Sequence, residues 1–424
     1  MTYQEILNHI YSLGRFGIRP GLDRITALLQ ALDNPQSTFK SVHVAGTNGK
    51  GSTSCFMASM LAEGGYRVGL FTSPHLISFT ERIRINGMEI FEEDVVRLGQ
   101  RVLSAAPAET TFFEMVTAMA CLHFAEQKVD LAVMEAGMGG SFDATNALDG
   151  ILSVITPISI DHSEYLGSSI AAIAREKAGI IKAGRPVVIS SQEPDARGEL
   201  EMRCRELDSP LYCCGRDFDA EWLENGLSYK GGAISLAGLR PGLCGSYQKF
   251  NAAVALAAVE ALGQAGFSMA MTAMSAGIEV AKWPGRMEML NTSPRILLDG
   301  AHNPAGSAAL AGALSEIPRR RLLLIVGVMG DKDLGGILGP ILPFADEVFA
   351  VAPLLPRALP AAELAEFCRR QGLMAHDAGS VTAGLAAARS RAGADDLILV
   401  CGSLFTVGEA RATLFSRQYE PFRG

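Results

Sequence analysis

The sequence lacks an excess of positive charge, paired cysteines and long apolar runs, and each absence excludes a class of protein. Its 37 lysines and arginines against 45 aspartates and glutamates give a formal net charge of −8, which does not favour binding to nucleic acid or to an anionic membrane. No apolar run approaches the ~18 residues that cross a bilayer. The eight cysteines form no CxxC pair, as expected of reduced thiols in a cytosolic protein. Because the first residues also lack the pattern of a secretory signal, we expect a cytoplasmic protein.

The chain has enough apolar material for two cores. Its 424 residues, 48% of them hydrophobic, exceed the ~100–200 residues of an ordinary domain. Short β-branched runs alternate with alanine-rich helical segments, which is typical of parallel sheets covered by helices. Strands are predicted at 41–46, 67–73, 130–137, 151–158 and 186–192, and a helix at 243–262.

The alternation breaks at 282–294, where prolines and a glycine bracket a short segment, and a second alternation of strands and helices follows. The sequence therefore predicts an α/β protein with two domains. We expect a P-loop-containing, parallel-sheet ATPase domain over 1–284, a linker over 285–294 and a smaller Rossmann-like α/β domain over 295–424.

A glycine-rich loop at 45–53, AGTNGKGST, follows the first predicted strand and opens a helix. Glycines let successive backbone N–H groups converge on phosphate oxygens, and the helix N-terminus adds the positive end of its dipole. The strict GxxxxGK[ST] pattern is not met, because Val44 stands at the first glycine position and Gly51 follows Lys50. A plain strand-to-helix turn is the alternative, but the strand before and the helix after favour nucleotide binding. The predicted ATP-binding residues of the loop are Gly46, Thr47, Asn48, Gly49, Lys50, Gly51, Ser52 and Thr53.

Several further motifs occur together and in order along the chain. They are TSPHL (72–76), ERIRINGMEI (81–90), DATN (143–146), DH (161–162), EKAGIIK (176–182) and DGAHNP (299–304). With GTNGKGS, this combination resembles folylpolyglutamate synthase, which is often bifunctional with dihydrofolate synthase in bacteria and belongs to the Mur ligase superfamily. The resemblance implies an ATP-dependent ligase that adds L-glutamate to the γ-carboxylate of a (tetrahydro)folate through an acyl phosphate. Whether dihydropteroate is also a substrate stays open.

The resemblance implies that Ser73, Glu135 and His162 bind two magnesium ions. Glu135 and His162 each follow an apolar strand, where a buried carboxylate needs a cation, although a lone strand-end histidine or serine is more often structural. The resemblance also implies that Lys177 is carbamylated by carbon dioxide, which turns an ammonium that cannot ligate a metal into a carboxylate-like ligand. The alternative is a lysine that faces solvent on a helix.

Residues for the substrates are implied in the same way. They are Lys50, Lys177 and His302 for catalysis, Asn251, Arg286 and Asp299 for ATP, and Phe113 and Asp143 for the folate. His302 would help to place the incoming glutamate. Asn251 has a helix N-cap as its alternative role, and Phe113 has a place in the core. Ser141 departs from the basic residue that this family commonly carries before its DATN motif.

Two other functions compete with the folate ligase. A Mur-type ligase for another carboxylate substrate is disfavoured, because the phosphate loop begins at residue 45 and leaves little room for a preceding substrate domain. A non-ligase P-loop ATP-binding protein would not need a second α/β domain joined through an arginine-bearing linker. The expected partners are ATP, a reduced folate or dihydropteroate and L-glutamate, and nothing in the apolar pattern requires more than a monomer.

Overall fold

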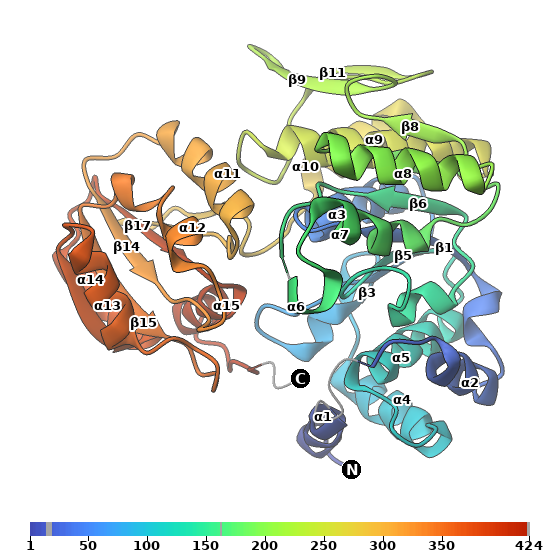
Figure 1. The fold of residues 1–424 in the computed structure, drawn as a ribbon, viewed down its shortest axis with the longest axis horizontal. Helices are drawn as coiled ribbons and strands as arrows, with labels where there is room; N and C mark the ends of the chain where they lie inside the picture. The colour runs from blue at the N-terminus through green and yellow to red at the C-terminus, as the bar shows by residue number, and fades with distance from the viewer. Residues whose placement is uncertain (14–18, 162, 422–424) are drawn as a thin grey trace.

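The computed structural model describes residues 1–13, 19–161 and 163–421. Two α/β units lie side by side, the first drawn from blue to yellow and the second from orange to red (Figure 1). Each unit has its own parallel sheet with helices on its faces, so the predicted fold class is confirmed. Within the described ranges, no helix is both long and apolar enough to cross a membrane.

The sheet of the first unit runs in the order β4-β3-β2-β5-β1-β6-β7-β8. Neighbours from β2 to β8 pair in parallel, and β3 and β4 add an antiparallel edge. The strands are β1 Lys40–Ala45, β2 Val68–Phe71, β3 Ile83–Ile85, β4 Met88–Glu89, β5 Leu131–Glu135, β6 Leu152–Ile155, β7 Val187–Ile189 and β8 Leu211–Cys213. The five strands predicted in this unit are confirmed as β1, β2, β5, β6 and β7.

Helices cover both faces of this sheet. One face packs on α3, α9 and α10, and the other on α1, α2, α4 and α5, while α7 and α8 pack together against β6 and β7. The helices are α1 Tyr3–Ser12, α2 Asp23–Ala31, α3 Lys50–Glu63, α4 Glu92–Ala105, α5 Phe112–Glu126, α6 Ser163–Leu166, α7 Ile170–Lys177, α8 Pro194–Glu206, α9 Gln248–Gln264 and α10 Met271–Val280. Short 3-10 turns are η2 Pro35–Thr38, η3 Phe79–Arg82, η4 Ala144–Ala147 and η5 Ala178–Ile180. Because both faces are covered, the strands read as continuous apolar runs.

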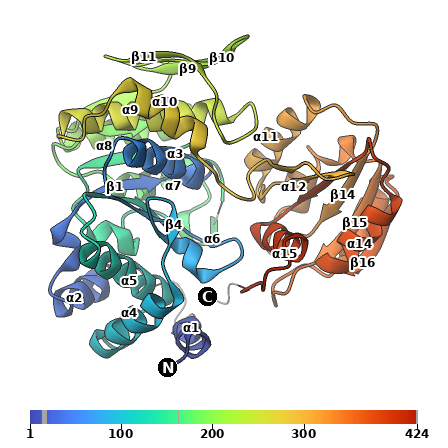
Figure 2. The ribbon, with the colours of Figure 1, turned by 180° about the vertical axis from the view of Figure 1, so that it is seen from behind.

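A small antiparallel sheet of order β11-β10-β9 lies outside α9, at the top of Figure 2. Its strands are β9 Asp219–Leu223, β10 Gly226–Lys230 and β11 Ser235–Leu239. The sequence did not predict this sheet, because most of its residues are polar or exposed, and its buried apolar side chains are those of Ala220, Leu227, Tyr229 and Leu239. The helix predicted from 243 begins at Gln248, after a turn in which Gly245 has a φ of +105°.

The second unit has a sheet of order β12-β13-β17-β14-β15-β16, parallel except for β12. Its strands are β12 Glu288–Leu290, β13 Arg295–Leu298, β14 Leu322–Val326, β15 Glu347–Ala352, β16 Ala375–Ser380 and β17 Leu397–Cys401. Its helices are α11 Pro304–Ser315, α12 Leu334–Leu338, α13 Ala361–Arg370, α14 Val381–Arg391 and α15 Leu404–Leu414, with the 3-10 turn η6 Leu342–Phe344. Part of the segment expected as a linker thus joins the second sheet, since β12 pairs with β13.

The loop after β2 and the last described residues connect the two units a second time. Leu76 and Ile77 lie in one apolar cluster with Val407 of α15. Glu420 donates its backbone N–H to the Ile77 carbonyl at 2.9 Å, and its carboxylate accepts from the Phe79 N–H at 2.8 Å. The end of the second unit therefore binds the first unit, close to α1 (Figure 1).

We expect Gly277→Ala in α10 to lower the thermal unfolding midpoint, because a Cβ there would lie 2.3 Å from the Met60 Cα in α3. Overpacking of this kind costs about 1–3 kcal/mol. Gly312→Ala in α11, where a Cβ meets nothing within 4 Å, is the matched control and should be neutral or stabilising. Calorimetry measures both, and equal shifts in the two variants would contradict the close helix contact.

Candidate active site

The phosphate loop folds tightly between β1 and α3. Gly46 and Gly49 have φ values of +147° and +86°, and an added Cβ would lie 1.9 Å from Thr156 Oγ1 and 2.3 Å from Asn251 Oδ1, respectively. The backbone N–H groups of Thr47 and Asn48 donate to the Pro157 carbonyl at 2.9 and 3.2 Å. Both glycines are required by backbone conformation as well as by space.

Lys50, the first residue of α3, curls back over this loop. Its Nζ donates to the Gly46 and Thr47 carbonyls at 3.2 and 3.4 Å and lies 4.0 Å from Glu135 Oε1. Ser52 and Thr53 follow in the first turn of α3 and are buried. A cation at a helix N-terminus beside glycine N–H groups suits an anionic phosphate chain.

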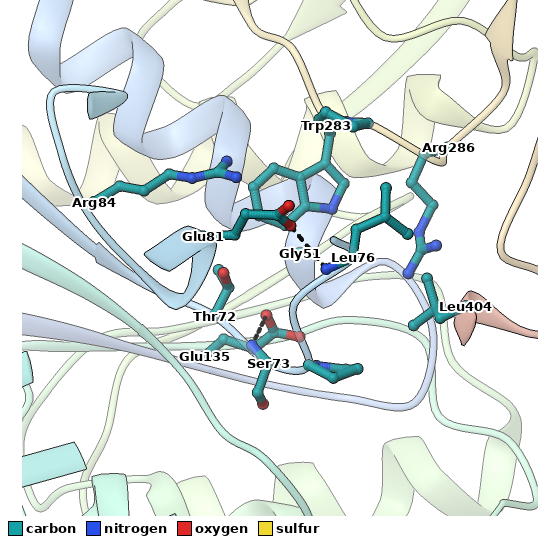
Figure 3. A pocket seen from close by; sticks show the side chains of 12 residues that line it. Gly51, Thr72, Ser73, Leu76, Glu81, Arg84, Glu135, Trp283, Arg286 and Leu404 are labelled. Atoms are coloured by element: carbon teal, nitrogen blue, oxygen red, sulfur yellow. Dashed lines mark hydrogen bonds between the residues drawn. The ribbon is translucent and has the colours of Figure 1, made fainter. Parts of the chain in front are cut away.

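Ser73 and Glu135, two of the predicted metal ligands, lie together at the ends of β2 and β5 (Figure 3). Glu135 Oε2 accepts from the Ser73 N–H at 3.3 Å, and burial raises the pKa of Glu135 while Lys50 opposes the rise. The third predicted ligand, His162, lies outside the described residues. A serine hydroxyl and a buried carboxylate are oxygen donors that fit Mg²⁺, which keeps several waters. Among the described side chains, no group of three or more His, Cys, Asp or Glu converges.

Lys177 ends α7 and is buried against the same loop. Its Nζ donates to the Gly46 carbonyl at 2.8 Å, and burial, with Lys50 nearby, lowers its pKa to about 7. The alternative of a solvent-facing lysine is therefore wrong, since the side chain is 4% exposed.

Asp299 and His302 follow β13 in the second unit. Asp299 is buried, and its carboxylate accepts from the Met287 and Ala301 N–H groups, each at 2.9 Å, which joins the segment before β12 to the turn after β13. His302 Nδ1 lies 2.9 Å from the Gly300 carbonyl, and its Nε2 is 3.8 Å from Asp161 Oδ2.

Polar contacts join the phosphate loop to the start of α11. Asn303 Nδ2 donates to Asn48 Oδ1 at 3.0 Å, and Asn48 Nδ2 donates back to Asn303 Oδ1 at 3.3 Å. Beside this pair, Lys332 Nζ donates to Asp161 Oδ1 at 2.7 Å. Lys332 was not predicted as a site residue, because its loop carries no recognisable signal in the sequence. Asn303 lies within the DGAHNP motif.

Asn251 and Arg286 lie on two sides of the loop. Asn251 is the fourth residue of α9, whose N-cap is Tyr247, so the N-cap alternative is wrong. Its Nδ2 donates to Gln248 Oε1 at 2.7 Å. Arg286 donates to the Gly285 carbonyl at 3.2 Å and passes so close to Gly300 that a Cβ there would lie 2.1 Å from its guanidinium.

A pocket at the junction of the units brings several of these residues together (Figure 3). Ser73 and Glu135 lie on one side, Arg84 and Trp283 on another, and Arg286 with Leu404 on a third. The lining is completed by Gly51, Thr72, Pro74, Leu76, Glu81 and Pro284. Arg84 and Trp283 were not singled out from the sequence, although both stand inside or beside motifs that were.

Phe113 and Asp143 both contact Gly137, in the loop after β5. The Phe113 ring packs closely on Gly137, since a Cβ added to this glycine would lie 2.6 Å from the ring. Asp143 accepts four hydrogen bonds, from Gly137 N, Met138 N and both the N–H and the hydroxyl of Thr145, at 2.6–3.0 Å. Its acceptor capacity is thus used within its own loop, and contact with a pterin would require these bonds to rearrange.

Both units of the chain match known domain families. The Mur ligase middle domain matches residues 44–259, and the Mur ligase glutamate ligase domain matches 285–404. The dihydrofolate synthase/folylpolyglutamate synthase of Bacillus subtilis is 35% identical over 430 residues, which cover 97% of this chain and 99% of that protein. The chain belongs to the folylpolyglutamate synthase family of Mur ligases. The resemblance predicted from the motifs is confirmed.

Other members of the family differ in length and in bound molecules. A probable folylpolyglutamate synthase/dihydropteroate synthase of Haloferax volcanii is 37% identical, and this chain spans about half of it (50%) while 97% of the chain is covered. Escherichia coli FolC in complex with DHPP and ADP superposes with a TM-score of 0.88 at 31% identity, covering 97% of this chain and 98% of that one. A bifunctional folylpolyglutamate synthase/dihydrofolate synthase with Mn, AMPPNP and L-glutamate bound has a TM-score of 0.87 at 31% identity, covering 97% of this chain and 98% of that one.

Gly49→Ala should weaken binding of a non-hydrolysable ATP analogue at least about tenfold. An alanine in the left-handed backbone conformation costs ~1–2 kcal/mol, and its Cβ would also clash with Asn251. Isothermal titration measures the affinity. Gly198→Ala, on the open side of α8, is the control and should bind as the wild type does. Equal affinities in all three proteins would show that this loop does not hold the nucleotide.

Proposed function

We propose that this protein is an ATP-dependent ligase that joins L-glutamate to the γ-carboxylate of a reduced folate. The observation that carries the proposal is the junction pocket, where Ser73 and Glu135 face Arg286 beside the phosphate loop. Relatives of nearly the same length bear the names folylpolyglutamate synthase and dihydrofolate synthase. We further propose that the protein acts as a cytoplasmic monomer.

The reaction has two steps, and the first activates a poor electrophile. A carboxylate oxygen of the acceptor attacks the γ-phosphorus of ATP, and the bond between that phosphorus and the β,γ-bridging oxygen breaks. ADP is the leaving group, and the acceptor becomes an acyl phosphate. Lys50 and the N–H groups at the start of α3 would stabilise the charge on the transferring group. Ser73, Glu135 and His162 would hold Mg²⁺, which supplies further neutralisation of phosphate charge when bound.

In the second step the amine of glutamate attacks the acyl carbon. The carbon–oxygen bond to phosphate breaks, inorganic phosphate leaves, and the proton of the amine passes to solvent. We propose that the second unit, 295–424, presents the glutamate with His302, and that Asp299, Arg286 and Asn251 contact the nucleotide held by the first unit, 1–284. The pairing of Asn48 with Asn303 supports this assignment, because it brings the start of α11 to the phosphate loop.

Lys177 is proposed to carry a carbamate that completes the metal site. Its burial favours the neutral amine, the form that adds to carbon dioxide, and its Nζ lies 2.8 Å from the carbonyl of the loop that it would serve. Phe113 and Asp143 are proposed to border the pterin end of the acceptor. The bacterial relatives named for both activities favour dihydropteroate as a second acceptor.

The first experiment is ADP release from purified protein with ATP, magnesium and L-glutamate. It is run with tetrahydrofolate, with dihydropteroate and with no acceptor. We expect turnover with both acceptors and none without. Turnover with tetrahydrofolate alone would restrict the protein to polyglutamate synthesis. If folded protein that binds ATP releases no ADP with either acceptor, the proposal is overturned and a Mur-type ligase for another carboxylate is favoured.

Lys177→Ala is expected to abolish turnover without unfolding the protein. In ¹³C-bicarbonate, wild-type protein should show a carbamate carbonyl signal by NMR that the variant lacks. Lys230→Ala, an exposed lysine on β10, is the control and should keep both the signal and the activity. A signal of equal strength in Lys177→Ala would place the carbamate elsewhere.

A further inference from the structure

Arg84, on β3, lines the junction pocket (Figure 3), and its ion pair with Glu89 is a long one. Its nearest acidic neighbour, Glu89, is 3.7 Å away, beyond hydrogen-bond distance, and the other Glu89 oxygen accepts from the Thr80 hydroxyl at 2.6 Å. Its Nε is buried and has no acceptor among the described residues. The side chain is 12% exposed, so water compensates little of its charge.

Trp283 holds this guanidinium in place. The Arg84 Cζ lies 5.1 Å from the indole centroid, within the range of a cation–π contact. The indole in turn packs on the first turn of α3, where a Cβ on Gly51 would lie 2.8 Å from Trp283 Nε1. The orientation of Arg84 is therefore tied to the helix that carries the phosphate loop.

The acids of the pocket do not neutralise Arg84. The Glu81 carboxylate accepts from the N–H groups of Leu76 and Ile77, at 2.7 and 2.9 Å, and from that of Ser78 at 3.1 Å. Glu135 faces Lys50 and the Ser73 N–H. The pocket thus keeps a positioned, desolvated cation that is suited to an anionic ligand.

We propose that Arg84, positioned by Trp283, binds the carboxylate of the acceptor that does not react. This inference rests on the proposed function. The terminal glutamyl residue of a folate carries its α- and γ-carboxylates a few bonds apart, so a γ-carboxylate beside Ser73 and Glu135 brings the α-carboxylate into the same pocket. A carboxylate removed from water there needs a charge-assisted partner.

The position of Arg84 favours the acceptor over the incoming glutamate. Of the described residues that line the pocket, Leu404 alone lies beyond β12, so the first unit and the segment before β12 build its walls. His302, proposed to place the incoming glutamate, is not part of that lining. Arg84 is accordingly a specificity-determining residue for acceptors that end in glutamate, and Trp283 is its positioning residue.

The test compares tetrahydrofolate with its α-amide, in which the γ-carboxylate is free and the α-carboxylate is not charged. Arg84→Gln should raise the KM for tetrahydrofolate about tenfold or more, which corresponds to loss of a charge-assisted hydrogen bond. The KM for the α-amide should stay within about twofold of the wild-type value, as should those for ATP and glutamate. Dihydropteroate, whose single carboxylate is the one that reacts, should behave like the α-amide.

Two further variants make the result specific. Arg84→Lys keeps the charge and should recover part of the loss, and it also serves if Arg84→Gln does not fold. Arg101→Gln, which alters an exposed arginine that pairs with Glu126, should match the wild type with every substrate.

Each other outcome overturns the assignment in a different way. An equal loss with tetrahydrofolate and its α-amide would make Arg84 merely structural, and a raised KM for glutamate would place the incoming amino acid there. Unchanged kinetics would leave Arg84 without a role in recognition. If the wild type uses none of these acceptors, the proposed function fails and this assignment fails with it, whereas wild-type turnover without discrimination by Arg84 overturns the assignment alone.

Discussion

The carbonyl oxygen of Gly46 accepts hydrogen bonds from two lysines, at 3.2 Å from Lys50 and at 2.8 Å from Lys177, and the rest of the site depends on this meeting. It joins the end of β1, the start of α3 and the end of α7 at one point. Two ammonium groups so close repel each other, and the buried Glu135 offsets only part of that charge. The arrangement is stable when anions occupy the loop or when one lysine loses its charge, and burial, together with the nearby Lys50, lowers the pKa of Lys177.

Much of the architecture could be predicted because it depends on local signals. Buried parallel strands are continuous apolar runs, and the loop before Lys50 needs glycine where φ is positive. Ser73 and Glu135 were both expected at strand ends, and they meet because β2 and β5 are parallel neighbours, whose carboxyl ends share one edge of the sheet. The sheet of β9–β11 could not be predicted, because most of its residues are exposed and its few buried side chains pack in one cluster with α9.

Contacts between distant segments carried no signal in the sequence. Arg84 meets Trp283 across about half the chain, and Lys332 meets Asp161 across the junction of the two units. In the sequence, each of these charged residues could equally be a solvent-exposed side chain, and the tryptophan could be an ordinary core residue. Asp143 shows the opposite case, in which the motif was evident but the structure gives its carboxylate four partners within its own loop.

The two units are joined both by the segment before β12 and by the last described residues, where Glu420 bonds to Ile77 and Phe79. A body held at one point can swing in any direction, whereas a body held at two points turns about the line between them. The loop 75–79 lies at one end of that line and begins two residues after Ser73. Because Asn303 bonds to Asn48 and Lys332 bonds to Asp161, the second unit can turn about that line only by breaking polar contacts, and the resistance to opening is concentrated at the α11 edge of the site.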